Sequence, residues 1–207
     1  MKQQDYIQDI TDIRSMMERS TKFLSLSGWA GIMAGIYALI GAYVAYRVFY
    51  FNPDEIIYAS LSESVYSDGL INVIALAIGI LLLAVGTAAY LSNRKALKRN
   101  EKLWNATSKR LLFNMSVPLV AGGLLILILI SKGLIGLIAP MTLIFYGLSL
   151  YIAGKYTFED IKILGLIEIV LGLISCYYIG YGLLFWALGF GVGHIIYGIY
   201  VHYKYEK

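Results

Sequence analysis

The sequence predicts an all-α fold, a polytopic membrane bundle of six transmembrane helices, with both termini cytoplasmic and an interfacial amphipathic helix before the first span. Hydrophobic residues make up 59% of the 207-residue chain. Charged residues make up only 14%, whereas soluble domains carry about 25%. The apolar residues gather in uncharged stretches near the roughly 20 residues that one crossing needs. The Lys and Arg residues concentrate in alternate connections, as in membrane proteins of fixed orientation.

Residues 1–22 form the first predicted element, an amphipathic helix on the cytoplasmic surface of the membrane. Tyr6, Ile10, Ile13 and Met17 recur at spacings of three and four residues, which is the period of one helix face. Acidic residues come early and basic residues late, in keeping with the helix dipole. Residues 23–207 then form the membrane domain.

Six stretches of this domain predict transmembrane helices. Each is apolar throughout rather than alternating, which argues against the strands of a membrane barrel. The last two form a helical hairpin that reverses near Gly180. The predicted spans are 23–48, 69–92, 111–131, 134–154, 161–179 and 183–203.

The basic residues predict the orientation. With six spans, all but two of the 17 Lys and Arg residues fall on one side of the membrane, and only Arg47 and Lys132 fall on the other. The positive-inside rule makes the basic side cytoplasmic. We therefore expect a multi-pass protein of the inner (cytoplasmic) membrane with both ends of the chain inside.

Two connections predict surface contacts. Asn52 and Pro53 are a cap and a first-turn residue, so residues 52–68 predict a short surface helix. Residues 94–110 are strongly basic with Leu97 and Trp104 interleaved. Because this connection lies beside two spans, it predicts binding to anionic lipid headgroups of the bilayer and no binding to nucleic acid.

The start of span five has a signal of its own. Thr157 to Asp160 approximate a capping box, in which the first side chain bonds the backbone of the fourth residue. This pattern predicts where the helix that carries Glu168 begins.

Glu168 and His194 are the carboxylate and the imidazole that lie deepest in the terminal hairpin. A charged group at membrane depth is costly unless it is paired, hydrated or protonated, so it usually faces the protein interior. At 1.5 Å per residue, Glu168 lies about 10 Å into its helix and His194 about 13 Å from the same face. We expect the two to pair directly or through a water and to bind a proton or ligand. A purely structural hydrogen bond between two helices is the other interpretation.

Three polar residues lie at comparable depth in other spans: Asn114, Ser116 and Thr87. Together with Glu168 and His194 they could line a small polar cavity, and the sequence predicts them as further ligand-binding or proton-binding positions. Local bonding of each to its own helix is the alternative.

Helix packing is predicted at four glycines. Gly31 with Gly35 and Gly189 with Gly193 form GxxxG pairs, the spacing that lets two membrane helices approach closely. Such pairs indicate packing rather than chemistry.

No catalytic motif occurs in the sequence. The zinc-protease, nucleophile-elbow and phosphate-loop patterns are all missing. The lone Cys176 excludes an internal disulfide and a cysteine metal cluster. We therefore expect no enzyme, no cofactor and no metal site.

Three segments carry a resemblance to a known group of proteins: MMERSTKFLSLSGWAG, LIAPMTLIFYGLSLYIAGKYTFEDIKILGLIEIVLGL and GLLFWALGFGVGHIIYGIY. They resemble a group of uncharacterised six-span bacterial integral membrane proteins, which implies the same fold and no particular activity. The terminal hairpin is also similar, in the spacing of its residues, to small acid-resistance membrane proteins built of Gly-rich hairpins.

The sequence favours a non-enzymatic binding, sensing or regulatory role, in which the Glu168/His194 centre biases helix packing. The alternative is a small transporter or channel subunit that uses the same residues to pass protons, ions or a small solute. An accessory subunit is a third interpretation. It implies a partner membrane protein or a homo-oligomer.

Overall fold

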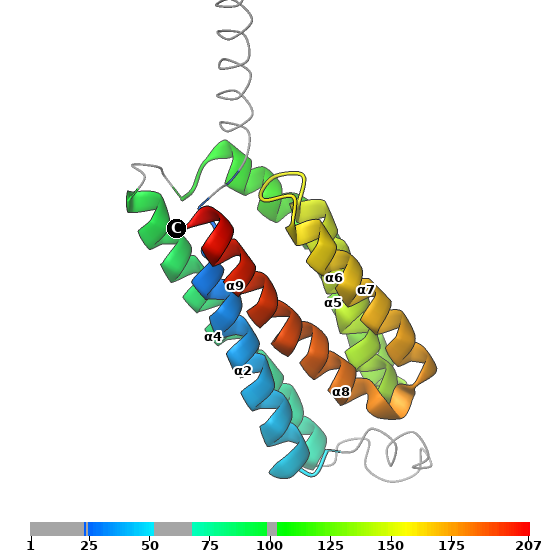
Figure 1. Ribbon diagram of the computed structural model, residues 1–207. Helices are drawn as coiled ribbons and strands as arrows, with labels where there is room; N and C mark the ends of the chain where they lie inside the picture. The colour runs from blue at the N-terminus through cyan, green and yellow to red at the C-terminus, as the bar shows by residue number, and fades with distance from the viewer. Residues whose placement is uncertain (1–22, 24, 52–67, 99–102) are drawn as a thin grey trace, which may run out of the picture.

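The computed structural model describes residues 23, 25–51, 68–98 and 103–207 (Figure 1). Every regular element within these residues is a helix, which confirms the all-α prediction. The helices predicted over residues 1–22 and 52–68 fall outside the described residues, except for residue 68, and so do residues 99–102 of the basic connection. The elements are α2 (Gly28–Arg47), α4 (Asp68–Lys98), α5 (Ala106–Ser131), η1 (Ile135–Leu137), α6 (Ile138–Ala153), α7 (Ile161–Tyr177), η2 (Ile179–Tyr181), α8 (Gly182–Trp186), the π-helix η3 (Ala187–Gly193) and α9 (His194–Tyr205).

Five helical stretches of the described residues are long and apolar enough to cross a membrane. Helix α7 is shorter, with 17 residues. Helices α4 and α5 expose long rows of Leu, Ile and Val, which suits contact with lipid tails. This architecture is compatible with an integral, multi-pass membrane protein. The five stretches are Gly28–Arg47, Ile71–Lys98, Ala106–Ser131, Ile135–Ala153 and Ile179–Tyr205.

The long helices form two groups of three (Figure 1). In one group α2 packs against α4 and α9, and in the other α6 packs against α5 and α7. The short helix α8 packs mainly against α6 and α7, and the π-helix η3 contacts both α7 and α2. The last helical stretch of the chain therefore passes from one group to the other, and η3 is one of the places where the two groups meet.

Glycines allow the closest helix contacts in each group. A Cβ atom added to Gly165 of α7 would lie 2.6 Å from the carbonyl oxygen of Gly147 in α6, and the reverse distance is also 2.6 Å. Gly28 of α2 and Gly198 of α9 are arranged in the same reciprocal way. Because the obstructing atoms belong to the backbone, neither pair has room for a side chain.

Helix α2 begins at Gly28 rather than at residue 23 as predicted. The backbone N–H of Phe23 donates to the carbonyl oxygen of Tyr156 at 2.6 Å, and the Thr157 hydroxyl donates to the carbonyl oxygen of Phe23 at 2.7 Å. These bonds hold the chain at Phe23 against the connection between α6 and α7. Thr157 is thus engaged with Phe23, and the predicted capping box is wrong: α7 begins at Ile161 with Asp160 as its N-cap and without a side-chain cap bond.

The basic connection is partly helical. Helix α4 continues to Lys98, beyond the predicted end at residue 92, and α5 begins at Ala106 instead of 111. Asn105 caps α5 reciprocally with Ser108, because the Asn105 side chain accepts from the Ser108 N–H at 2.8 Å and the Ser108 hydroxyl accepts from the Asn105 N–H at 2.9 Å. Both helices therefore extend beyond the predicted spans at their polar ends.

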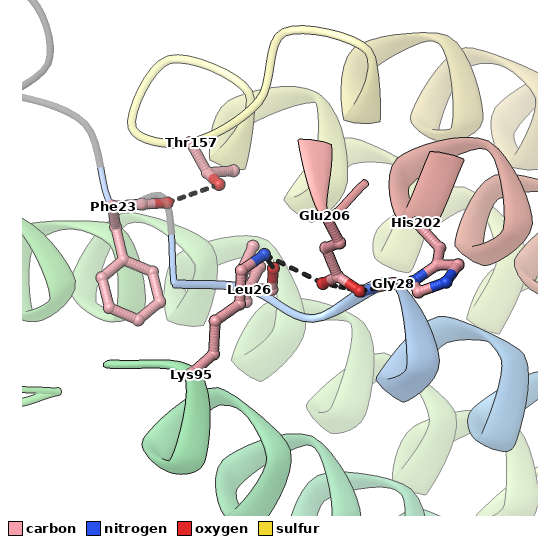
Figure 2. A network of polar contacts seen from close by, with 7 residues as sticks. All are labelled: Phe23, Leu26, Gly28, Lys95, Thr157, His202 and Glu206. Carbon is pink, nitrogen blue, oxygen red and sulfur yellow. Dashed lines mark hydrogen bonds and ion pairs between the residues drawn. The ribbon is translucent and has the colours of Figure 1, made fainter. Parts of the chain in front are cut away.

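Four residues form a polar cluster, which we call the C-terminal clasp (Figure 2), at the end of the bundle where the C-terminus lies (Figure 1). It consists of Gly28, Lys95, His202 and Glu206. Oε1 of Glu206 accepts from the Gly28 N–H and from Lys95 Nζ, both at 2.9 Å, and Oε2 lies 2.7 Å from Nδ1 of His202. Lys95 also donates to the carbonyl oxygen of Leu26 at 2.6 Å. The clasp ties α2, α4 and α9 together at one end.

Candidate functional site

Glu168 lies in the middle of α7 and is completely buried, with 0% of its side chain exposed. Neither carboxylate oxygen has a hydrogen-bond partner among the described residues. A Cβ atom on Gly189 of η3 would collide with Oε2 of Glu168, so the carboxylate fills the space that the missing side chain leaves. A carboxyl group that is fully buried in this way needs its negative charge neutralised by a proton or by a cationic neighbour.

His194 is the nearest ionisable neighbour of Glu168. Its Nδ1 lies 3.4 Å from Oε1 of Glu168 and 3.2 Å from the carbonyl oxygen of Gly189. Since a carbonyl oxygen can only accept, we assign the hydrogen of the neutral ring to Nδ1. The distance to Glu168 is slightly longer than a direct N–H···O bond, whose range is about 2.7–3.2 Å. Glu168 and His194 therefore form a close pair of ionisable groups without a direct hydrogen bond between them.

Tyr146 of α6 completes the pair on its other side. Its hydroxyl lies 3.0 Å from Nε2 of His194. With neutral His194 this hydroxyl donates to Nε2, and with a protonated ring it accepts instead. The phenol can thus follow either state of His194 without leaving a polar atom unpaired.

An aromatic cluster surrounds His194. The Phe190 ring stacks on the imidazole with centroids 5.8 Å apart, and lies 4.9 Å from the Tyr146 ring and 5.0 Å from the Trp186 ring. The Tyr146 and Phe190 rings thus cover part of the imidazole, which is buried. Sequence reasoning missed Tyr146, because a single Tyr in an apolar stretch looks the same whether it faces lipid, an interface or another helix.

The site is built on the π-helix η3. Single π turns inside longer helices are rare and often mark functional positions. In η3, Gly189 faces Glu168 and Leu143, whereas Gly191 faces Leu39 of α2. The widened turn and its glycines let one segment contact both helix groups, and His194 follows directly as the first residue of α9.

The other predicted polar residues make contacts away from Glu168 and His194. The Asn114 side chain donates to the carbonyl oxygen of Arg110 at 2.8 Å, and Ser116 donates to that of Phe113 at 2.8 Å. The Thr87 hydroxyl lies 3.2 Å from the Tyr37 hydroxyl. Thus the structure brings Glu168 and His194 together, and the hydrogen bonds of Asn114, Ser116 and Thr87 lead elsewhere.

The predicted packing glycines lie at contacts between helices. A Cβ atom on Gly31 would lie 3.3 Å from the carbonyl oxygen of His194, and one on Gly35 would lie 2.5 Å from that of Gly191. A Cβ atom on Gly193 would lie 3.3 Å from Leu164. The glycines of α2 therefore support the backbone that carries His194.

The described residues contain no cluster of three or more His, Cys, Asp or Glu residues that could hold a metal ion. The chemistry available at Glu168 and His194 is binding and release of a proton. No protein-family model, curated protein or solved structure matches this chain.

Proposed function

We propose that this chain is a non-enzymatic integral protein of the inner membrane in which Glu168 and His194 bind one proton and thereby bias helix packing. The observation that carries the proposal is the buried carboxylate of Glu168, which lies 3.4 Å from His194 and has no hydrogen-bond partner among the described residues.

The charge of the pair supports a proton-binding role. An ionised Glu168 beside a neutral His194 is a net negative charge inside the apolar bundle. One added proton makes the pair neutral, either as two uncharged groups or as an ion pair. Because an uncompensated charge at membrane depth costs several kcal/mol, the packed arrangement favours the state that holds the proton.

The contact with Gly189 supports a link between protonation and packing. An ionised carboxylate must be hydrated if no cation compensates it, and hydration needs space for water. Oε2 of Glu168 already occupies the space beside Gly189. Loss of the proton should therefore favour separation of η3 from α7, and the two helix groups meet at η3. Because none of the hydrogen bonds of Asn114, Ser116 and Thr87 leads to Glu168 or His194, we favour sensing over passage of an ion.

We expect Trp186 to report this change, since its ring packs 5.0 Å from Phe190, which stacks on His194. In a Trp29→Phe/Trp104→Phe background, the protein is placed in nanodiscs and only Trp186 fluoresces as tryptophan. Its fluorescence should change with pH in the range where carboxyl and imidazole groups bind protons. Glu168→Gln keeps the shape of the side chain and should abolish that transition.

Glu206→Gln is the matched control, because it removes a carboxylate at the clasp and should preserve the Trp186 transition. An identical titration in Glu168→Gln, or none in the unsubstituted background, would contradict the proposal. Proton leakage into liposomes that Glu168→Gln stops would instead favour transport.

We also propose six spans with both termini cytoplasmic, with α7 as the crossing that precedes the final one. In the described residues the basic side chains are concentrated at the helix ends that the C-terminus shares, and Arg47 and Lys132 lie at the opposite ends. This distribution supports the orientation through the positive-inside rule.

Cysteine labelling tests this topology. In a Cys176→Ser background, Tyr181→Cys should react with an impermeant maleimide added to intact cells. Lys155→Cys and Lys207→Cys should react only after permeabilisation. Equal labelling of positions 155 and 181 would show that α7 does not cross the membrane, and equal labelling of 181 and 207 would show the same for the last helix.

A further inference from the structure

A shallow groove of about 510 Å³ runs along the surface between α2 and α4. Its lining is almost entirely apolar. Its polar side chains are Tyr90 and Thr87, whose hydroxyl contacts that of Tyr37 in α2. At 1.5 Å per residue, the part of the groove from Leu82 to Leu91 is about 13 Å long. The lining residues are Met33, Leu82, Leu83, Gly86, Thr87, Tyr90 and Leu91.

The groove leads to basic residues at the end of α4. Tyr90 lines the groove, and the Arg94 guanidinium lies 5.9 Å from the centre of the Tyr90 ring. Lys98 follows one turn later at the helix end. Both basic side chains are exposed, and neither forms an ion pair within the described residues. The apolar groove thus ends near two exposed positive charges that form no ion pair within the described residues.

We propose that this groove binds one anionic phospholipid, with an acyl chain along Gly86 and the headgroup at Arg94 and Lys98. The inference needs the membrane placement proposed above but is independent of proton binding at Glu168. In a bilayer the groove cannot select its ligand by apolarity, because lipid tails are as apolar as leucine. Selection must come from the headgroup, which each nearby basic residue favours about fivefold.

Gly86 makes the groove testable. A Cβ atom on Gly86 would meet no other atom within 4 Å, so a side chain can start there without a clash against α2. Leucine at this position would occupy the space of the acyl chain. Gly123 of α5 is equally open and lies outside the groove, which makes it the matched control.

Native mass spectrometry of the delipidated full chain measures the binding directly, with phosphatidylglycerol and phosphatidylcholine of identical acyl chains as probes. We expect one phosphatidylglycerol to bind in preference to phosphatidylcholine. Gly86→Leu should remove that site and Gly123→Leu should retain it. Arg94→Gln should weaken phosphatidylglycerol binding about fivefold and leave phosphatidylcholine unchanged, whereas Lys132→Gln at the C-terminal end of α5 should change neither.

Three results would overturn the proposal. Equal binding of the two lipids would remove the role of the headgroup, and equal effects of Gly86→Leu and Gly123→Leu would remove the groove. A dimer that only Gly86→Leu dissociates would show that a second copy of the chain occupies the groove. Each result leaves the Trp186 titration of Glu168 unaffected, so the two proposals fail separately.

Discussion

Gly165→Ala is expected to destabilise the protein, whereas Gly123→Ala is expected to leave it as stable or slightly more stable. At Gly165 the new methyl group would lie 2.6 Å from the Gly147 carbonyl oxygen and 2.8 Å from the Tyr151 nitrogen. These are backbone atoms, so α6 and α7 must move apart. Overpacking of this kind typically costs about 1–3 kcal/mol.

The control works in the opposite direction. A methyl group added to Gly123 would meet no other atom within 4 Å, and alanine in a helix interior is favoured over glycine by up to about 1 kcal/mol. Thermal unfolding in one detergent, followed by circular dichroism, measures both variants. A Gly165→Ala protein that unfolds at or above the wild-type temperature would contradict the close packing of α6 on α7.

Glu206→Gln is expected to destabilise the end of the bundle at neutral pH. The Glu206 side chain is only 12% exposed and accepts from Lys95 and from the Gly28 N–H. Hydrogen bonds to charged groups contribute about 1.5–3 kcal/mol. Glutamine keeps the size of the side chain but leaves Lys95 without that negative partner, so the unfolding temperature should fall.

A double-mutant cycle isolates the contact between the two charges. Lys95→Met alone should also destabilise the protein, and the double variant should lose less than the sum of the two single losses. Additive losses would show that Lys95 and Glu206 act independently and would contradict the clasp.

The stabilisation by Glu206 should depend on pH in a definite direction. Burial raises the pKa of Glu206, but hydrogen bonds from His202, Lys95 and the Gly28 N–H outweigh it and lower the pKa from 4.5 to about 2. A carboxyl group with a lowered folded-state pKa contributes its stabilisation above its ordinary pKa and loses it as the pH falls toward the lowered value. The stability difference between wild type and Glu206→Gln should therefore shrink between pH 4.5 and about 2.

The helical class and the approximate positions of the helices were predictable because they depend on local composition. Long apolar stretches must satisfy their own backbone groups, and only a helix does so within a single segment. Their ends were less predictable. The sequence placed the start of the first span at residue 23. In the structure, Phe23 bonds Tyr156 and Thr157 instead, and α2 begins only at Gly28. No local pattern encodes a bond across that distance in the chain.

The candidate site was predictable only in part, for the same reason. Counting residues from the helix ends places Glu168 and His194 at a similar depth in the membrane. In the structure, Nδ1 of His194 lies 3.4 Å from Oε1 of Glu168. The same count grouped Thr87 with them, but depth does not specify which side of the bundle a residue occupies. Thr87 instead contacts Tyr37 between α4 and α2.

What could be read directly from the residue order is a chain of long apolar helices with its basic residues at alternate connections. These are properties of each segment alone. The division into two helix groups, the π-helix that joins them and the clasp from Gly28 to Glu206 depend on contacts between distant segments. Those contacts require complementary shapes and charges that exist only once the helices have packed, so they belong to the tertiary structure.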